Sequence, residues 1–274
     1  MSREPPHRWP AEATPISDEL EHDGTVCHRT EAHPALGYRL WGPSYGSHLL
    51  SPDGERLRVD PEATPPGAWQ RLLIAQVLPF AALLHGLEVF HASAVVVQSG
   101  AVGLLGPSGS GKTTLAFELC QRGAVFLADD VLVVEPHGGS LLAHPGAPVL
   151  GLDHGEARRR AGLGTSLDRM QIDANERERL LRVGRIGGPA PIAALFLLDR
   201  RPDGPAEPTF DAAVQPRTLL AATFNFVLDA PDRLLRLLEA CALLAEGRVE
   251  RVLAGPRVSP AQLARAITSR LERN

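Results

Sequence analysis

The chain has 274 residues, of which 44% are hydrophobic and 22% are charged. These are the values of an ordinary globular protein, and they exclude a chain that is disordered throughout. The net charge of -4 excludes a general attraction for nucleic acid or for an anionic membrane, so we expect neither as a partner.

The three cysteines, Cys27, Cys120 and Cys241, lie far apart and form no CxxC pair. This pattern suits a reducing compartment and predicts neither a disulfide framework nor a zinc site. The N-terminal residues contain no apolar signal core. The most apolar stretch, residues 77–97, is interrupted by proline, histidine and glutamate, which makes it a poor membrane span. We therefore expect a cytoplasmic protein.

Three regions are predicted in chain order. Residues 1–35 are rich in proline, histidine and glutamate without periodicity, which predicts a flexible N-terminal arm. Residues 36–66 contain short alternating runs between turn residues, with Asp53-Gly54 as a hairpin turn, and predict a small β element. Residues 67–274 are predicted to form one larger domain.

The third region begins with apolar residues at helical spacing, which predict a helix over 69–87 with a kink at Pro79. Strands are predicted over 89–97, 101–105 and 124–128, with a helix over 113–121 between the last two. Further strands are predicted over 131–135, within 141–152, over 191–199 and over 248–255. Residues 154–185 are polar and helical in parts, residues 200–211 form a loop, and helices cover 219–245 and 260–273. This alternation predicts an α/β fold.

A glycine-rich motif, GxxxxGK[ST], follows the strand over 101–105 and opens the next helix. In this context the motif predicts a P-loop, because its backbone N–H groups can surround phosphate oxygens at a helix N-terminus. The Thr113 hydroxyl would bind Mg²⁺ and the Lys112 ammonium would reach the terminal phosphates of ATP. The expected nucleotide-binding residues are Gly106, Pro107, Ser108, Gly109, Ser110, Gly111, Lys112, Thr113 and Thr114.

Lys112 is the only lysine of the chain, and the other 27 basic residues are arginines. Arginine bias of this kind accompanies GC-rich coding. A single lysine in a chain with this bias indicates a position that needs a compact ammonium and does not accommodate the larger, planar guanidinium of arginine.

Two adjacent aspartates, Asp129 and Asp130, follow the strand that leaves the P-loop helix. Open α/β sheets bind their ligands at this edge. One carboxylate, assigned to Asp129, can hold Mg²⁺, and the other, Asp130, can accept the proton of an attacking hydroxyl. The alternative is that the pair only ends a strand and caps a turn.

Two further features are open to a structural or a functional interpretation. His91 lies at the start of a predicted strand, 21 residues before Lys112, where a histidine can be structural or catalytic. Residues 156–185 contain eight arginines, which can form a solvated helical face or a mobile flap that supplies arginine to the transferred phosphate.

The sequences HASAVVV, GLLGPSGSGKTTLAFELCQRGA and FLADDV together resemble the HPr kinase/phosphorylase family, and more closely its short relatives, which include kinases of lasso-peptide precursors. The resemblance is specific over residues 70–134 and weak beyond them. It implies a mixed sheet of the HPr kinase and phosphoenolpyruvate carboxykinase type and a homo-oligomer. It also implies active-site roles for His91, Lys112 and Asp130, and it assigns Arg217 to a catalytic arginine of the family.

The chain departs from the full-length family members in two respects. The segment over 144–152 lacks the metal-binding glutamate of the bifunctional enzymes. Only about 35 residues precede the small β element, so we expect the larger N-terminal domain of those enzymes to be absent. The predicted function is therefore an ATP- and Mg²⁺-dependent kinase of a serine-type hydroxyl on a peptide or small protein. A small-molecule kinase and a nucleotide-binding regulator without transferase activity remain the alternatives. A transporter ATPase is disfavoured, since no LSGGQ-like signature is present.

Overall fold

The computed structural model describes residues 9–20, 24–61, 67–161, 171–174, 177–211, 216–224 and 231–273. The chain divides into two compact units, Met1–Gly86 and Leu87–Asn274. The predicted boundary between residues 66 and 67 is therefore corrected, because the helical region after it belongs to the N-terminal unit. Its apolar side packs against the small sheet, where the rings of Tyr38 and Phe80 meet edge to face at 4.9 Å.

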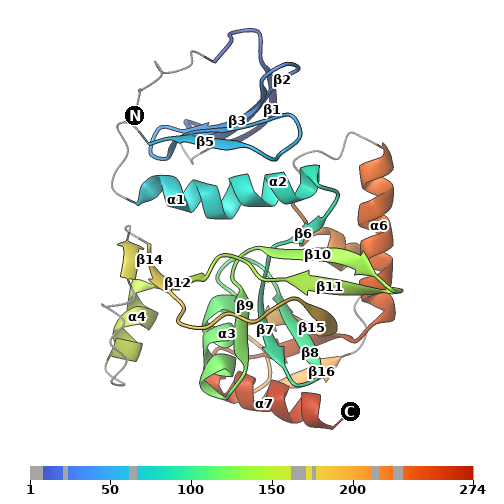
Figure 1. Ribbon diagram of the computed structural model, residues 1–274. Helices are drawn as coiled ribbons and strands as arrows, with labels where there is room; N and C mark the ends of the chain where they lie inside the picture. Colours follow the sequence, from blue (N-terminus) through green and yellow to red (C-terminus); the bar gives the residue numbers. More distant parts are fainter. Residues whose placement is uncertain are drawn as a thin grey trace. The chain divides into compact units, whose positions relative to one another are not determined.

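The N-terminal unit contains one antiparallel sheet whose strands follow one another in chain order. Its strands are β1 (Thr14–Leu20), β2 (Val26–His33), β3 (Gly37–Gly42), β4 (Gly46–Leu50) and β5 (Leu57–Asp60). A helical run covers one face of this sheet, and Figure 1 shows it running along one side of the strands. It consists of α1 (Ala68–Leu72), the π-helical turn η1 (Leu73–Val77) and α2 (Leu78–Leu84).

The predicted flexible arm is wrong where β1 and β2 form. β1 is polar and largely exposed, and β2 is polar although it is half-buried, so neither strand carries an alternation of apolar residues that a sequence pattern could detect. Residues 1–8 of the arm lie outside the described part of the chain. The hairpin turn is confirmed: Gly54 has a φ of 76°, and its N–H donates to the Ser51 carbonyl at 2.9 Å.

At the position of the predicted kink, the helical run contains a π-helical turn just before Pro79. Pro79 is the second residue of α2, directly after η1. Proline lacks an N–H and crowds the preceding turn, and a π-helical turn is one way in which a helix accommodates such a site.

The C-terminal unit is built on a mixed sheet, which confirms the predicted α/β class at this level. Its main path runs β6-β10-β11-β15-β8-β7-β9, with β17 beside β15 and β16 beside β17. The parallel pairs are β8 with β15 and β15 with β17, and the others are antiparallel. The strands are β6 (Glu88–Phe90), β7 (Ala92–Val97), β8 (Gly100–Leu105), β9 (Val125–Ala128), β10 (Leu132–His137), β11 (Ser140–His144), β15 (Ala190–Arg200), β16 (Thr209–Asp211) and β17 (Val249–Ala254).

Helices cover both faces of this sheet (Figure 1). On β8, Leu105 packs in the cluster that contains α6 (Pro231–Glu246). Leu104 packs in the cluster that contains α3 (Lys112–Gln121) and α7 (Pro260–Glu272). Neighbouring side chains of a strand point to opposite faces of the sheet. A strand such as β8, which is buried on both faces, therefore has a continuous run of apolar residues in its sequence.

A second, smaller sheet of the C-terminal unit lies within the arginine-rich region. It has the order β12 (Val149–Asp153), β14 (Glu178–Arg182), β13 (Gln171–Ala174), and α4 (His154–Ala161) packs beside it. The prediction of helix in parts is confirmed at α4, and the strands β13 and β14 form in other parts of the region. Residues 162–170 and 175–176 lie outside the described residues.

Two predicted elements are interrupted. The strand over 89–97 breaks at His91, because β6 pairs with β10 whereas β7 pairs with β8 and β9. The helix over 219–245 is replaced by a short helix, α5 (Pro216–Leu220), and by α6, which begins at Pro231. Proline fits the first turn of a helix and disrupts its interior, so Pro231 marks a start.

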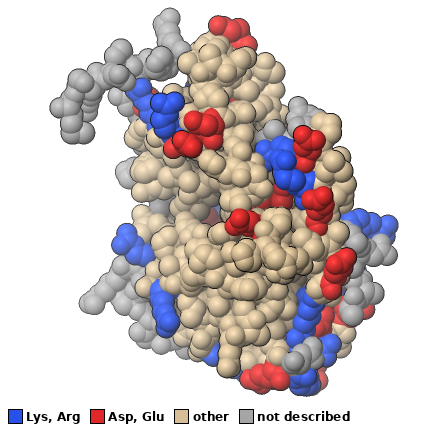
Figure 2. Space-filling view, turned by 45° about the vertical axis from the view of Figure 1, so that its right-hand side comes forward, with Lys and Arg blue, Asp and Glu red and all other residues tan. Residues whose placement is uncertain are grey.

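Among the described residues, no helix is long and apolar enough to cross a membrane. Basic and acidic side chains are interspersed over the face shown in Figure 2, as the modest net charge of -4 leads one to expect.

Candidate active site

A glycine-rich loop over residues 106–111 joins β8 to α3. Gly106, Gly109 and Gly111 have φ values of 146°, 77° and 92°, which L-amino acids with a Cβ rarely adopt. A Cβ on Gly106 would lie 2.9 Å from the Leu198 carbonyl oxygen, whereas one on Gly109 would meet nothing within 4 Å. The loop is therefore packed against β15 at its start and open at Gly109.

The strand order brings three separate segments to one edge of the sheet. β7 lies between β8 and β9 and is antiparallel to both. Ala92, at the start of β7, pairs with Leu105 at the end of β8, and Ala94 pairs with Ala128 at the end of β9. His91, the loop and the aspartate pair therefore meet at this edge.

Lys112, His91 and Asp130 form a chain of hydrogen bonds. The Lys112 ammonium donates to His91 Nε2 at 3.1 Å and to the Gly106 and Pro107 carbonyls at 2.8 and 3.3 Å. His91 Nδ1 lies 3.0 Å from Asp130 Oδ1. Because Nε2 accepts from the ammonium, the ring proton is on Nδ1 and faces the carboxylate. The imidazole thus links the lysine to the second aspartate.

Asp129 is held by three donors. Its Oδ1 accepts from the hydroxyls of Ser93 at 2.5 Å and Thr113 at 2.8 Å, and its Oδ2 accepts from the Gly151 N–H at 3.0 Å. The carboxylate is thereby tied to β7, α3 and β12 at once. Thr113 and Asp129, the predicted metal-binding pair, therefore lie within hydrogen-bond distance of each other.

The two aspartates differ in their electrostatics. Burial raises the pKa of Asp129 to about 6, although the Ser93, Gly151 and Thr113 hydrogen bonds lower it. Burial acts in the same direction on Asp130, but the hydrogen bond and charge of His91 and the charge of Lys112 outweigh it and lower the Asp130 pKa. Burial lowers the pKa of Lys112, against the two aspartates, which raise it. Asp130 is therefore an ionised carboxylate at neutral pH.

Asp130 has a further distinguishing feature in its backbone. With a φ of 66°, it is the one non-glycine residue with positive φ among the described residues. Such conformations cost energy and cluster at functional sites. The side chain is 53% exposed, so a hydroxyl can approach the carboxylate from solvent.

The remaining predicted residues are placed differently. Ser110 in the loop is buried, and its hydroxyl has no hydrogen-bond partner among the described residues. Thr114 follows in the first turn of α3. Arg217 lies in α5 and is exposed. The segment after it reaches the cluster, since His91 N–H donates to the Ala222 carbonyl at 2.6 Å. Within the described residues, no hydrogen bond or ion pair joins the Arg217 side chain to His91, Lys112 or Asp130.

Sequence reasoning missed three groups at this edge. Ser93 and the Gly151 N–H hold Asp129. Arg200, at the end of β15, donates to the Val258 carbonyl at 2.6 Å, and its other terminal nitrogen lies 4.0 Å from the position of a Cβ on Gly111. Ser93 could have been noticed two residues after His91, whereas the others depend on strand pairing and give no local signal.

A metal site made by the protein alone is not present in the described residues, because no three histidine, cysteine, aspartate or glutamate side chains there are grouped to hold an ion. Mg²⁺ in phosphoryl-transfer sites is typically held by one or two protein groups together with substrate phosphates and water. Thr113 and Asp129 suit that second arrangement.

No protein-family model and no curated protein matches the chain. Among solved structures, the HPr(Ser) kinase/phosphatase from Coxiella burnetii is similar at a TM-score of 0.35 and 12% sequence identity, over 68% of this chain and 95% of that chain. A TM-score of this size is too low to establish a shared fold, so the case for a function rests on the residues of this chain.

Proposed function

We propose that the protein is an ATP-dependent kinase of the HPr kinase type, which transfers the γ-phosphate to a serine-type hydroxyl of a peptide or small protein. The observation that carries the proposal is the hydrogen-bonded chain of Lys112, His91 and Asp130 beside the glycine-rich loop that joins β8 to α3. It places an ammonium, a histidine and an ionised carboxylate beside a loop suited to phosphate.

The loop fits a nucleotide phosphate in two respects. The space at Gly109 is open, and the buried Ser110 hydroxyl has no partner among the described residues, so both can accommodate phosphate oxygens. Lys112 supplies the one ammonium of the chain. Thr113 and Asp129 would hold Mg²⁺, which supplies charge neutralisation on the phosphates when it is bound.

In the transfer step, Asp130 accepts the proton of the attacking serine hydroxyl. The new phosphorus–oxygen bond forms at the serine oxygen as the bond to the leaving ADP oxygen breaks. His91 orients the Asp130 carboxylate through its Nδ1–H, and Lys112 balances the charge on the phosphoryl oxygens.

Incubation with Mg²⁺, ATP and the short polypeptides encoded beside this gene tests the proposal. We expect a mass gain of about 80 Da on a serine-containing polypeptide, the mass of one phosphate group. Lys112→Met should abolish both nucleotide binding and the mass gain. Phosphate on a hydroxyl metabolite alone would replace the proposal with a small-molecule kinase. Nucleotide binding without any transfer would replace it with a regulator.

A further inference from the structure

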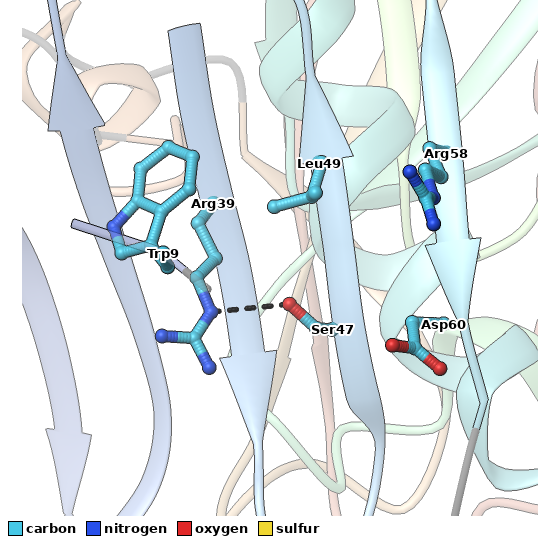
Figure 3. A pocket seen from close by; sticks show the side chains of 6 residues that line it. All are labelled: Trp9, Arg39, Ser47, Leu49, Arg58 and Asp60. Atoms are coloured by element: carbon cyan, nitrogen blue, oxygen red, sulfur yellow. Dashed lines mark hydrogen bonds between the residues drawn. The ribbon is translucent and has the colours of Figure 1, made fainter. Parts of the chain in front are cut away.

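Figure 3 shows a cavity of about 110 Å³ on the N-terminal unit, in which the charged side chains already have partners. Arg39 donates to Ser47 Oγ at 3.1 Å and lies 3.4 Å from the Glu31 carboxylate. Arg58 and Asp60, which also line the cavity, have interactions of their own. The charges of this cavity therefore give no basis for assigning a ligand to it.

A short segment of the C-terminal unit, residues 222–224, runs beside β6 and His91. The His91 N–H donates to the Ala222 carbonyl at 2.6 Å, and the Phe224 N–H donates to the Val89 carbonyl at 3.1 Å. The segment comes soon after α5 and lies along the edge of β6 that does not pair with β10. It therefore fixes the backbone of His91, which belongs to neither β6 nor β7.

The same pairing places the Phe224 ring beside the His91 ring. Phe90 and Thr223 form an antiparallel bridge. Phe224 therefore lies diagonally opposite His91, at a separation that aromatic side chains can span. The two ring centres are 6.3 Å apart, and the ring planes are inclined by 68°. This edge-to-face arrangement is one of those that aromatic pairs prefer.

The orientation of the His91 ring must be selected by its neighbours. The torsion that turns a histidine ring has broad minima, so the side chain by itself does not define one orientation. The ring is held at Nε2, which accepts from Lys112 at 3.1 Å, and at Nδ1, which lies 3.0 Å from Asp130. Phe224 is the third side chain that contacts the ring.

The hydrogen bond from Lys112 is the one for which a nucleotide would compete. An ammonium has three N–H donors, and here all three are used, by His91 and by two carbonyls of the glycine-rich loop. A phosphate oxygen bound to Lys112 must displace at least one of these acceptors. When His91 is the one displaced, its ring is held by Asp130 and Phe224.

We propose that Phe224 is a positioning residue, which keeps the His91 ring oriented toward Asp130. The proposal rests on the proposed kinase function, because His91 affects transfer through Asp130, the proton acceptor. The phenyl ring of Phe224 can neither exchange a proton nor bind a phosphate. Its substitution should therefore change the His91 ring and the transfer rate, and leave nucleotide affinity as it is.

Nitrogen NMR of the full chain, labelled in its histidines, measures the state of the His91 ring. Loss of signals in His91→Gln identifies the two His91 ring nitrogens. In mildly alkaline buffer the wild-type protein should show a proton on Nδ1 and none on Nε2. Phe224→Leu should bring the two signals closer together, because a less restrained ring populates both tautomers. This change should be larger with ADP and Mg²⁺ than without them, since Lys112 then turns to the phosphates.

Two further variants define the comparison. Phe224→Tyr keeps an aromatic ring and should retain the wild-type signals. Phe210→Leu is the matched control, because Phe210 lies in β16 and meets Phe196 edge to face at 6.0 Å, away from His91. Unchanged His91 signals in Phe224→Leu, or an equal change in Phe210→Leu, would overturn the proposal. Phe224→Ile keeps the test valid if Phe224→Leu does not fold.

Transfer and binding assays on the same samples separate this proposal from the kinase function. Phe224→Leu should lower the transfer rate on the order of tenfold through misplacement of the catalytic groups, at unchanged ADP affinity, and Phe224→Tyr should restore the rate. Loss of ADP affinity in Phe224→Leu would contradict a positioning role. Shifted His91 signals in a protein that transfers no phosphate would support the role of Phe224 and contradict the kinase function.

Discussion

Asp129 and Asp130 are neighbours in sequence, yet their surroundings suit them to different tasks. Three donors fix the Asp129 carboxylate beside Thr113, and burial raises its pKa to about 6. The Asp130 side chain is half exposed and accepts a hydrogen bond from His91. Partial desolvation raises its pKa, but His91 and Lys112 outweigh this effect and lower it. The first is therefore suited to hold a metal ion and the second to receive a proton.

Substitution of each aspartate should have a separable effect. Asp129→Asn should raise the Mg²⁺ concentration needed for activity, because the metal loses a charged ligand. Asp130→Asn should leave ADP binding intact and lower the transfer rate on the order of 10²–10⁴, the usual contribution of a positioned base. Titration calorimetry with ADP and a transfer assay at several Mg²⁺ concentrations measure these effects. Equal loss of ADP affinity in both variants would show that the pair acts only as a metal site.

Arg200 lies next to the glycine-rich loop, and a contact of its guanidinium with the nucleotide phosphates can be tested by a single substitution. Its guanidinium is anchored on Val258 and borders Gly111, so Arg200→Gln should weaken ADP binding about tenfold through loss of one charge-assisted contact. The adjacent Arg201 is engaged by Asp199 at 2.9 and 2.7 Å, and Arg201→Gln should change ADP affinity less than about twofold. Equal effects of the two substitutions would argue against a phosphate contact by Arg200.

At the scale of elements, β7 determines the site. Its position between β8 and β9 brings His91 to the edge where the loop and the aspartates end. Because His91 lies between β6 and β7, its side chain does not follow the alternation of side chains between the two faces of the sheet. β7 thus sets the position of His91, the residue directly before it. It also contains Ser93, whose hydroxyl donates to the Asp129 carboxylate.

The small N-terminal sheet should lose stability in mild acid. His48 is fully buried, and burial lowers its pKa from the ordinary value of 6.5, although the Trp69 carbonyl raises it. The unfolded state therefore binds more protons than the folded state below about pH 6.5, and stability falls as pH drops through that value. A tenfold difference in proton affinity between the two states corresponds to about 1.4 kcal/mol of unfolding free energy.

Unfolding midpoints of the full chain, measured between about pH 7.5 and pH 5, test this expectation. His48→Gln keeps a donor for the Trp69 carbonyl without titrating, so it should flatten the pH dependence. His137→Gln, at the exposed end of β10 in the C-terminal unit, should leave the dependence as it is. An unchanged slope in His48→Gln would contradict the assignment.

At the scale of the whole molecule, the division after Gly86 places the candidate active site entirely in the C-terminal unit. His91, Lys112 and Asp130 all belong to it. Residues 87–274, expressed alone, should therefore bind ADP within a few-fold of the full chain, and calorimetry can compare the two. A folded fragment that does not bind ADP would mean that the N-terminal unit contributes to the nucleotide site.

Patterns local in sequence were sufficient to predict the α/β class, the strand–loop–helix connection at Lys112 and the aspartate pair at a strand end. Hydrophobic periodicity and glycine spacing act over a few residues, so they can be read without the fold. The polar strands β1 and β2 were missed, because they contain few apolar residues in alternation. The helical run over the small sheet was assigned to the wrong unit, because an apolar helix face can pack against either sheet.

Tertiary structure alone decided which side chains meet. His91 and Asp130 are 39 positions apart, and the contacts of Asp129 with Ser93 and Gly151 span 36 and 22 positions. Such pairs depend on strand order and register, since a slip of one residue turns a side chain to the opposite face of the sheet. The sequence by itself determined the chemical groups at this edge, and the pairing of β7 with β8 and β9 determined their geometry.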